Sequence, residues 1–118
     1  MPLPKISTHA AIDERIRLAC LEAGHSRVAV RFAAYAYAGF DNLDEVAAEG
    51  LVVLYHDNLY GGRPWSSGLL NRPTWLQVAV AANEAIIKTR DPDHHFLEYI
   101  SFRERANGVN HYKLGMGS

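Results

Sequence analysis

The chain is poor in cysteine and has no long hydrophobic run, and each absence excludes a class of protein. Cys20 is the only cysteine among 118 residues, so the chain cannot form an internal disulfide. Cys20 lies among apolar residues at helical spacing, where cysteine acts as a small hydrophobic residue rather than as a catalytic thiol. No apolar run reaches the roughly 18 residues that span a bilayer, and residues 1–5 contain no apolar segment typical of a signal peptide. We therefore expect a cytoplasmic protein without a membrane segment.

An excess of charge of either sign is also lacking. Lys and Arg number 12 and Asp and Glu number 13, which gives a formal net charge of −1 and an isoelectric point near 6.6. Because tight nucleic-acid binding needs a surplus of cations to displace counterions, this balance disfavours a nucleic-acid partner. Hydrophobic residues make up 48% and charged residues 21%, as in ordinary soluble domains. The length predicts one domain over residues 1–118.

The familiar sequence signatures of catalysis are missing as well. The chain contains no His-Glu-x-x-His, no Cys-x-x-Cys, no Gly-x-Ser-x-Gly, no Walker-type lysine loop and no dinucleotide-binding glycine pattern. A serine, a histidine and an aspartate can be combined on paper in any chain with six histidines. The sequence therefore assigns no catalytic residue, leaves enzymatic activity open and favours its absence.

Apolar residues recur at helical spacing and predict four helices. Their ranges are 8–23, 26–38, 42–59 and 73–89. Gly24 is placed to end the first helix, because glycine readily adopts the left-handed conformation at a helix C-terminus. The prediction of the second helix depends on the many alanines of residues 29–38, which favour helix formation. The alternation of Val28, Val30 and Phe32, however, also fits a strand.

The last third of the chain allows two interpretations. Asp91 and Pro92 could cap and begin a fifth helix, which would make the protein all-α. Residues 95–103, however, are rich in β-forming side chains, and Asn107-Gly108 is the strongest short hairpin signal in the chain. The fold we expect is α+β, with four helices packed against a C-terminal β-hairpin. The hairpin residues expected to face the core are Phe96, Ile100, Phe102, Tyr112 and Leu114.

The core should combine one face of each helix with the inner face of the hairpin. The expected core residues are Ile16, Cys20, Phe32, Val46, Leu51, Leu54, Trp75, Val78, Ala82, Ile86, Ile100 and Leu114. The second, third and fourth predicted helices are more apolar than a helix with only one buried face requires. This surplus predicts self-association, and a two-fold homodimer is the commonest closed assembly.

Residues 91–98 form the one dense group of chemically active side chains. Imidazole and carboxylate groups are ligands for divalent metals such as zinc, iron or manganese, so His94, His95 and Glu98 are candidate metal ligands. Further ligands would have to come from a distant part of the chain, with His56, Asp57 and His111 as the candidates. The alternative to a metal site is a purely structural role, in which Asp91-Pro92-Asp93 form a turn and the histidines make ordinary hydrogen bonds. The sequence implies no cofactor other than a divalent metal.

Residues 60–73 form a loop rich in glycine and proline that could recognise a partner. Arg63, Trp65 and Arg72 are candidate binding residues, because tryptophan and arginine are enriched in protein interfaces. Packing of Trp65 into the core is the alternative. The sequence thus favours a small non-enzymatic interaction or regulatory module with a protein partner. The alternative is a metal-binding protein or small metal-dependent enzyme that uses His94, His95 and Glu98.

Overall fold

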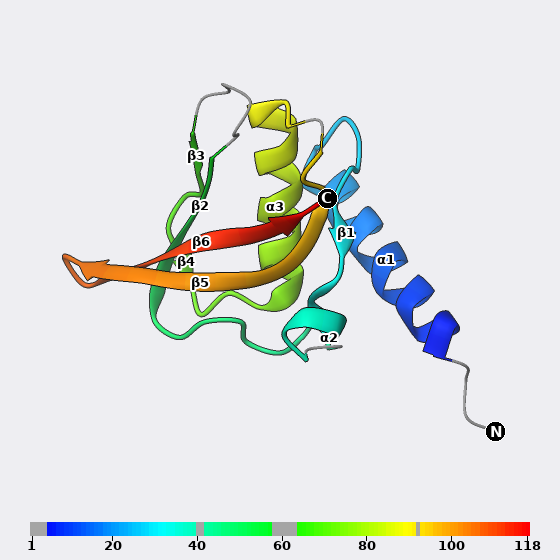
Figure 1. Ribbon diagram of the computed structural model, residues 1–118, viewed down its shortest axis with the longest axis horizontal. Coiled ribbons are helices and arrows are strands. Elements are labelled where there is room, and N and C mark those ends of the chain that lie inside the picture. The colour runs from blue at the N-terminus through cyan, green and yellow to red at the C-terminus, as the bar shows by residue number, and fades with distance from the viewer. Residues whose placement is uncertain (1–4, 40–41, 58–63, 92) are drawn as a thin grey trace.

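The computed structural model describes residues 5–39, 42–57, 64–91 and 93–118, with side chains described from residue 10 onward. These residues form an α+β domain in which helices pack against a mixed sheet (Figure 1). The elements in chain order are α1 (Lys5–Glu22), β1 (Arg31–Phe32), α2 (Ala34–Tyr37), β2 (Leu51–His56), β3 (Trp65–Ser66), β4 (Leu70–Asn71), α3 (Trp75–Thr89), β5 (Phe96–Ala106) and β6 (Val109–Gly117).

The six-stranded sheet is built around the C-terminal hairpin. Its strand order is β1-β5-β6-β2-β3, and β4 pairs with the other end of β2. Strands β5 and β6 are antiparallel, whereas β6 pairs in parallel with β2 and β5 in parallel with β1. At the hairpin turn Asn107 and Gly108 have φ angles of 53° and 78°, the left-handed conformations that a two-residue hairpin requires. The predicted hairpin is confirmed.

Helix α3 is the central helix, and it lies behind the sheet in Figure 1, with α1 beyond it. The Thr74 side chain accepts from the Gln77 backbone N–H, and the Gln77 side chain accepts from the Thr74 N–H, which satisfies two free donors at the helix start. Arg90 ends the helix in the left-handed conformation. The helices predicted over 8–23 and 73–89 are therefore confirmed as α1 and α3.

The prediction of a helix over residues 26–38 is wrong. Residues 31–32 form β1, which lies beside the start of β5, and only the four-residue α2 follows. The Arg31 and Ala33 N–H groups donate to the carbonyl oxygens of His95 and Leu97, where β5 begins. Alanine content favours a helix by only a few tenths of a kcal/mol per residue, so these tertiary hydrogen bonds outweigh local propensity.

The prediction of a helix over residues 42–59 is also wrong, because residues 51–56 form β2. Its buried residues Val52, Leu54 and His56 alternate with partly exposed ones, which is the period of a strand rather than of a helix. Gly50 precedes β2 with a φ angle of 77°, and this conformation interrupts a helix. The domain thus has three helices in its described part instead of four.

Most of the predicted core is buried, with a few informative exceptions. Val46 and Ile100 are only partly buried, and Leu51 is 41% exposed because it lies on the outer face of β2. Phe96 and Phe102 are 40% and 55% exposed, so the expectation that they face the core is wrong.

None of the described helices is long and apolar enough to cross a membrane.

Candidate functional site

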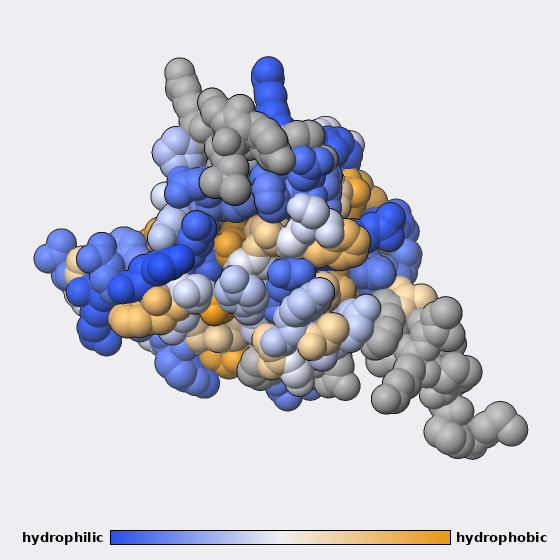
Figure 2. All heavy atoms as spheres, viewed as in Figure 1, coloured by the Kyte–Doolittle hydropathy of each residue, from blue (hydrophilic) through white to orange (hydrophobic). Residues whose placement is uncertain are grey.

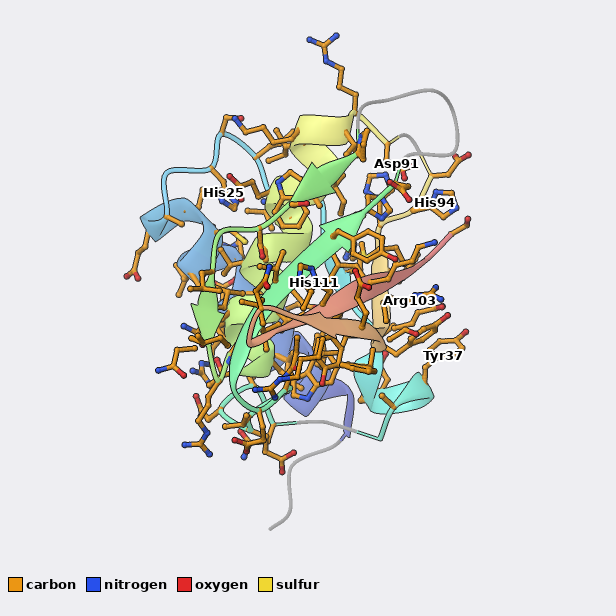
Figure 3. All side chains as sticks on the ribbon, turned by 90° about the vertical axis from the view of Figure 1, so that its left-hand side faces the viewer. His25, Tyr37, Asp91, His94, Arg103 and His111 are labelled. Carbon is orange, nitrogen blue, oxygen red and sulfur yellow. The ribbon has the colours of Figure 1, made fainter. Side chains whose placement is uncertain are left out.

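The helices α1 and α3 cover one face of the sheet, and the opposite face carries a compact group of polar and aromatic side chains. Strand register places Lys113 of β6 between Tyr55 of β2 and Ser101 of β5. One step further along, Tyr99 lies opposite Gly115. Figure 3 shows the labelled Arg103 and His94 on the side of the sheet that faces away from α3. We refer to this side as the uncovered face.

Irregular pairing within the hairpin determines which side chains reach the uncovered face. The register shifts between Leu97 and Tyr99 and again between Phe102 and Glu104, and each extra residue moves the following side chains to the other face. Arg103 lies at the second shift. Phe102 lies across from Tyr112 just before the second shift and packs edge-on against it, with ring centroids 5.6 Å apart. Because of the shift, His111 pairs with Glu104 instead of Arg103, and Arg103 lines the same hollow as Lys113.

The uncovered face contains a cavity at the end of β2, where β2 and β6 stop pairing. The cavity has a volume of about 190 Å³. It is lined by His56, Asp57, His94, Tyr99, Ser101, Arg103, Lys113, Leu114, Gly115 and Met116. Figure 2 shows the same face in space-filling form, with hydrophilic side chains at the hairpin tip and apolar side chains interspersed towards the centre. Cationic, aromatic and hydroxyl groups therefore surround one hollow.

Gly115 shapes this cavity by allowing an aromatic ring to lie on the strand. A Cβ atom on Gly115 would come within 2.6 Å of the Tyr99 ring, closer than any real side-chain contact. Aromatic side chains often cover a glycine on the neighbouring strand in this way. The Tyr99 ring is thus held flat over β6 as one wall of the cavity.

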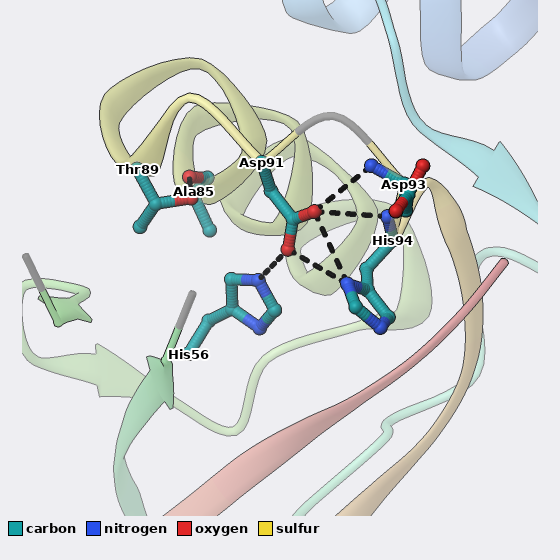
Figure 4. A network of polar contacts seen from close by, with 6 residues as sticks. All are labelled: His56, Ala85, Thr89, Asp91, Asp93 and His94. Atoms are coloured by element: carbon teal, nitrogen blue, oxygen red, sulfur yellow. Dashed lines mark hydrogen bonds and ion pairs between the residues drawn. The ribbon is translucent and has the colours of Figure 1, made fainter. Parts of the chain in front are cut away.

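A buried aspartate organises the polar end of the cavity (Figure 4). The Asp91 side chain is fully buried, and its Oδ1 accepts from the backbone N–H groups of Asp93 and His94, each at 3.0 Å. The ring nitrogen Nε2 of His56 lies 3.1 Å from Oδ2, and Nδ1 of His94 lies 3.0 Å from the same oxygen. The carboxylate therefore connects the end of β2 to the segment that enters β5.

The hydrogen bonds of Asp91 determine its protonation. Burial by itself raises the pKa of Asp91, but the backbone N–H groups of Asp93 and His94 and the two imidazoles favour the ionised form and lower this pKa to about 2. Hydrogen bonds that favour the charged form commonly have this effect on carboxylates. Asp91 is therefore an anion over the whole neutral range.

Asp91→Asn is expected to lower the free energy of unfolding by about 2 kcal/mol at neutral pH, since the pKa falls by nearly two units at about 1.4 kcal/mol each. Because the folded-state pKa lies at about 2, below the usual 3.8, the ionised carboxylate stabilises the protein above pH 4 and this contribution is lost as the pH falls towards 2. Urea unfolding of both proteins between pH 7 and pH 2.5 measures the difference. A difference that stays constant with pH would contradict the ionic role, and Asp93→Asn, at an exposed site, is the control.

The structure does not bring the three predicted metal ligands together. The ring of His94 contacts Asp91, the Nδ1 of His95 lies 3.3 Å from the carbonyl oxygen of Ala29, and the Glu98 carboxylate lies over Gly117. No group of three or more His, Cys, Asp or Glu side chains within the described ranges is arranged to hold a metal ion. Metal binding by His94, His95 and Glu98 stays a prediction.

The three predicted binding residues of the 60–73 loop have separate surroundings. Arg63 lies outside the described residues. Trp65 is 8% exposed and belongs to the hydrophobic core, whereas the exposed Arg72 pairs with Glu49 at 2.8 Å. The burial of Trp65 favours its alternative interpretation as a core residue. A binding role for Arg63 and Arg72 stays a prediction.

Sequence reasoning missed Arg103, Lys113, Tyr99 and Ser101. The two-residue period of a strand places Tyr99, Ser101 and Arg103 on one face, and this alternation could have predicted part of the group. The two register shifts in the hairpin, however, cannot be read from the spacing of residues alone. The buried Asp91 was noticed only as a member of a polar cluster, because its partner His56 lies 35 positions away.

A scan of protein-family models, a search of curated proteins and a search of solved structures each returned no match for this chain. A functional proposal therefore rests on the geometry of the uncovered face. Exposed apolar side chains elsewhere on the surface, such as Leu18 and Leu21 of α1, are compatible with the expected homodimer. Self-association itself stays a prediction.

Proposed function

We propose that this protein is a non-enzymatic binding module whose recognition surface is the uncovered face of the sheet. The observation that carries the proposal is the cavity of about 190 Å³ between the end of β2 and the hairpin. Binding sites in proteins are typically concave, with apolar walls and a few polar groups that fix orientation. Here the Tyr99 ring supplies an apolar wall, and Arg103 and Lys113 supply the polar groups.

Binding is favoured over catalysis because the groups best suited to chemistry are engaged in the fold. A general acid or base works best with a pKa near the working pH, whereas the pKa of Asp91 is about 2. Its carboxylate already accepts four hydrogen bonds from Asp93, His94 and His56. Burial raises the pKa of the Cys20 thiol to about 11, so the reactive thiolate is scarce at neutral pH.

The proposal is tested by closing the cavity without adding or removing a charge. In Gly115→Ala the new methyl group displaces the Tyr99 ring, and we expect the cavity to lose its shape while the remaining sheet is retained. Gly68→Ala is the matched control, because a Cβ there meets no atom within 4 Å. A mixed set of small neutral, acidic and basic aromatic fragments is added to each 15N-labelled protein, and amide shifts are recorded by NMR.

We expect at least one fragment to shift the amides of Tyr99, Ser101 and Lys113 in the unaltered protein and in Gly68→Ala, but not in Gly115→Ala. Circular dichroism establishes that Gly115→Ala is folded, since overpacking a strand costs about 1–3 kcal/mol. Shifts that persist in Gly115→Ala, or fragments that bind only elsewhere, would remove the cavity as the recognition site. If Gly115→Ala does not fold, Ser101→Leu fills the same hollow from β5 and takes its place.

A further inference from the structure

We infer that the cavity binds a small organic anion, one carboxylate or phosphate group attached to a compact apolar body. This inference rests on the proposed binding function and names the ligand class of that site. It depends on three features of the described residues: the charges that line the cavity, the absence of acidic partners for two of them, and the size and walls of the hollow.

The two cations of the cavity, Arg103 and Lys113, differ from the three arginines of the surface that form ion pairs. Arg15 pairs with Asp44, Arg17 with Glu14, and Arg72 with Glu49. Within the part of the chain that the structure describes, Arg103 and Lys113 have no ion pair and no side-chain hydrogen bond. Lys113 is also partly buried, and a partly buried cation without a counter-charge favours binding of an anion.

The described acidic groups near the cavity form no ion pair with these cations. Asp57 is the one carboxylate that lines the hollow among the described residues, and it lies beyond the last residue pair of β2 and β6. Glu104 lies across from His111 at the outer part of the hairpin. The buried carboxylate of Asp91 contacts His56 and His94 and does not line the hollow. Among the described residues that line the hollow, two cations therefore face one carboxylate, and the Glu98 carboxylate over Gly117 lies outside this lining.

The position of the cations fits a single anionic group. Lys113 lies directly across from Ser101 on β5, and residues diagonally placed on neighbouring strands are about 7–8 Å apart. Arg103 follows Ser101 by two residues and lines the same hollow. A guanidinium and an ammonium at this spacing can contact one carboxylate or phosphate from two sides, with the Ser101 hydroxyl as a further donor.

Size and wall chemistry restrict the remainder of the ligand. The cavity of about 190 Å³ is somewhat larger than a cavity of roughly 150 Å³ that holds benzene. The Tyr99 ring on Gly115 presents apolar surface to it. A single ring or a short branched chain that carries the anionic group fills this space.

Four probes that share one ring test the inference: benzoate and phenyl phosphate as anions, benzamide as the neutral analogue and benzylamine as the cation. Inorganic phosphate is added as a fifth probe to separate the anionic group from the apolar body. Each is titrated to millimolar concentration at low salt into the 15N-labelled protein. We expect benzoate or phenyl phosphate to shift the amides of Tyr99, Ser101 and Lys113, with weaker binding by benzamide, inorganic phosphate and benzylamine.

Removing the two positive charges of the cavity provides a second test of the inference. In the double variant Arg103→Gln, Lys113→Gln the dissociation constant of the anion should rise about tenfold or more, because two charge-assisted contacts are lost. Arg105→Gln removes an exposed cation from the same strand outside the cavity and should leave binding unchanged. Added salt should weaken binding of the anions more than that of benzamide.

The outcomes separate this inference from the proposed function. If benzamide or benzylamine shifts the same amides as strongly as the anions, or if the double variant binds benzoate and phenyl phosphate unchanged, the cavity binds ligands but the anion assignment is overturned. If no probe shifts these amides, the anion assignment is overturned as well. The Gly115→Ala comparison then decides separately whether any other fragment uses the cavity.

Discussion

Trp65→Ala is expected to lower the free energy of unfolding by about 3–5 kcal/mol, the usual cost of truncating a large buried aromatic side chain. Trp65 is 8% exposed and lies on β3, across from His56 of β2. Its indole packs in the same core cluster as Val52 and Leu54. Removing it leaves a void that the rigid sheet cannot close. Chemical denaturation of both proteins, with two-state analysis, gives the difference.

The neighbouring Ser66 provides the control for this measurement. It is exposed on the same short strand, and Ser66→Ala should change the stability by less than about 0.5 kcal/mol. A loss below about 1 kcal/mol for Trp65→Ala would contradict its role in the core. The exposed-anchor interpretation of residues 60–73 would then be favoured again.

Asn83→Leu is expected to cost about 3–5 kcal/mol of stability, because buried polar groups left without partners cost about 1–3 kcal/mol each. The fully buried Oδ1 of Asn83 accepts from the N–H groups of Ala29 and Val30, at 2.7 and 3.1 Å. Its Nδ2 donates to the Arg27 carbonyl oxygen and to Nδ1 of His25. One side chain of α3 thus fixes the whole segment that leads into β1.

Leucine matches asparagine closely in volume, so this substitution removes the hydrogen bonds without creating a cavity. Lys88→Leu, at an exposed position of the same helix, should change the stability by less than about 0.5 kcal/mol. Thermal and urea unfolding measure the loss. Hydrogen exchange locates it, since the amides of Ala29 and Val30 should exchange faster in Asn83→Leu. Unchanged protection at these two amides would show that Asn83 does not fix the segment.

Local sequence predicted only a small part of the candidate site. The His94, His95 and Glu98 cluster attracted attention because its members are adjacent in the chain. In the fold only His94 lines the cavity, and it does so with Tyr99, Arg103 and Lys113 from two strands. Strand register and two irregularities in the hairpin bring these side chains together. Neither can be derived from residue spacing, because a shift of one residue moves a side chain to the other face.

The sequence alone determined the elements whose stabilising interactions are local. Helices α1 and α3 follow from apolar spacing and from the caps at their ends, and the hairpin follows from Asn107-Gly108, whose left-handed φ angles only a few residue types accept. Each of these signals acts within a few residues, so it is present in the unfolded chain.

Only the tertiary structure decided the elements whose partners lie far along the chain. Strand β2 pairs with β6, where Val52 lies beside Asn110, and β1 is fixed by Asn83 and by the segment entering β5. Parallel pairing gives its hydrogen bonds only after such distant segments have met. Residues 42–59 carry enough apolar side chains for a helix, and the neighbouring edge of β6 is what makes residues 51–56 a strand.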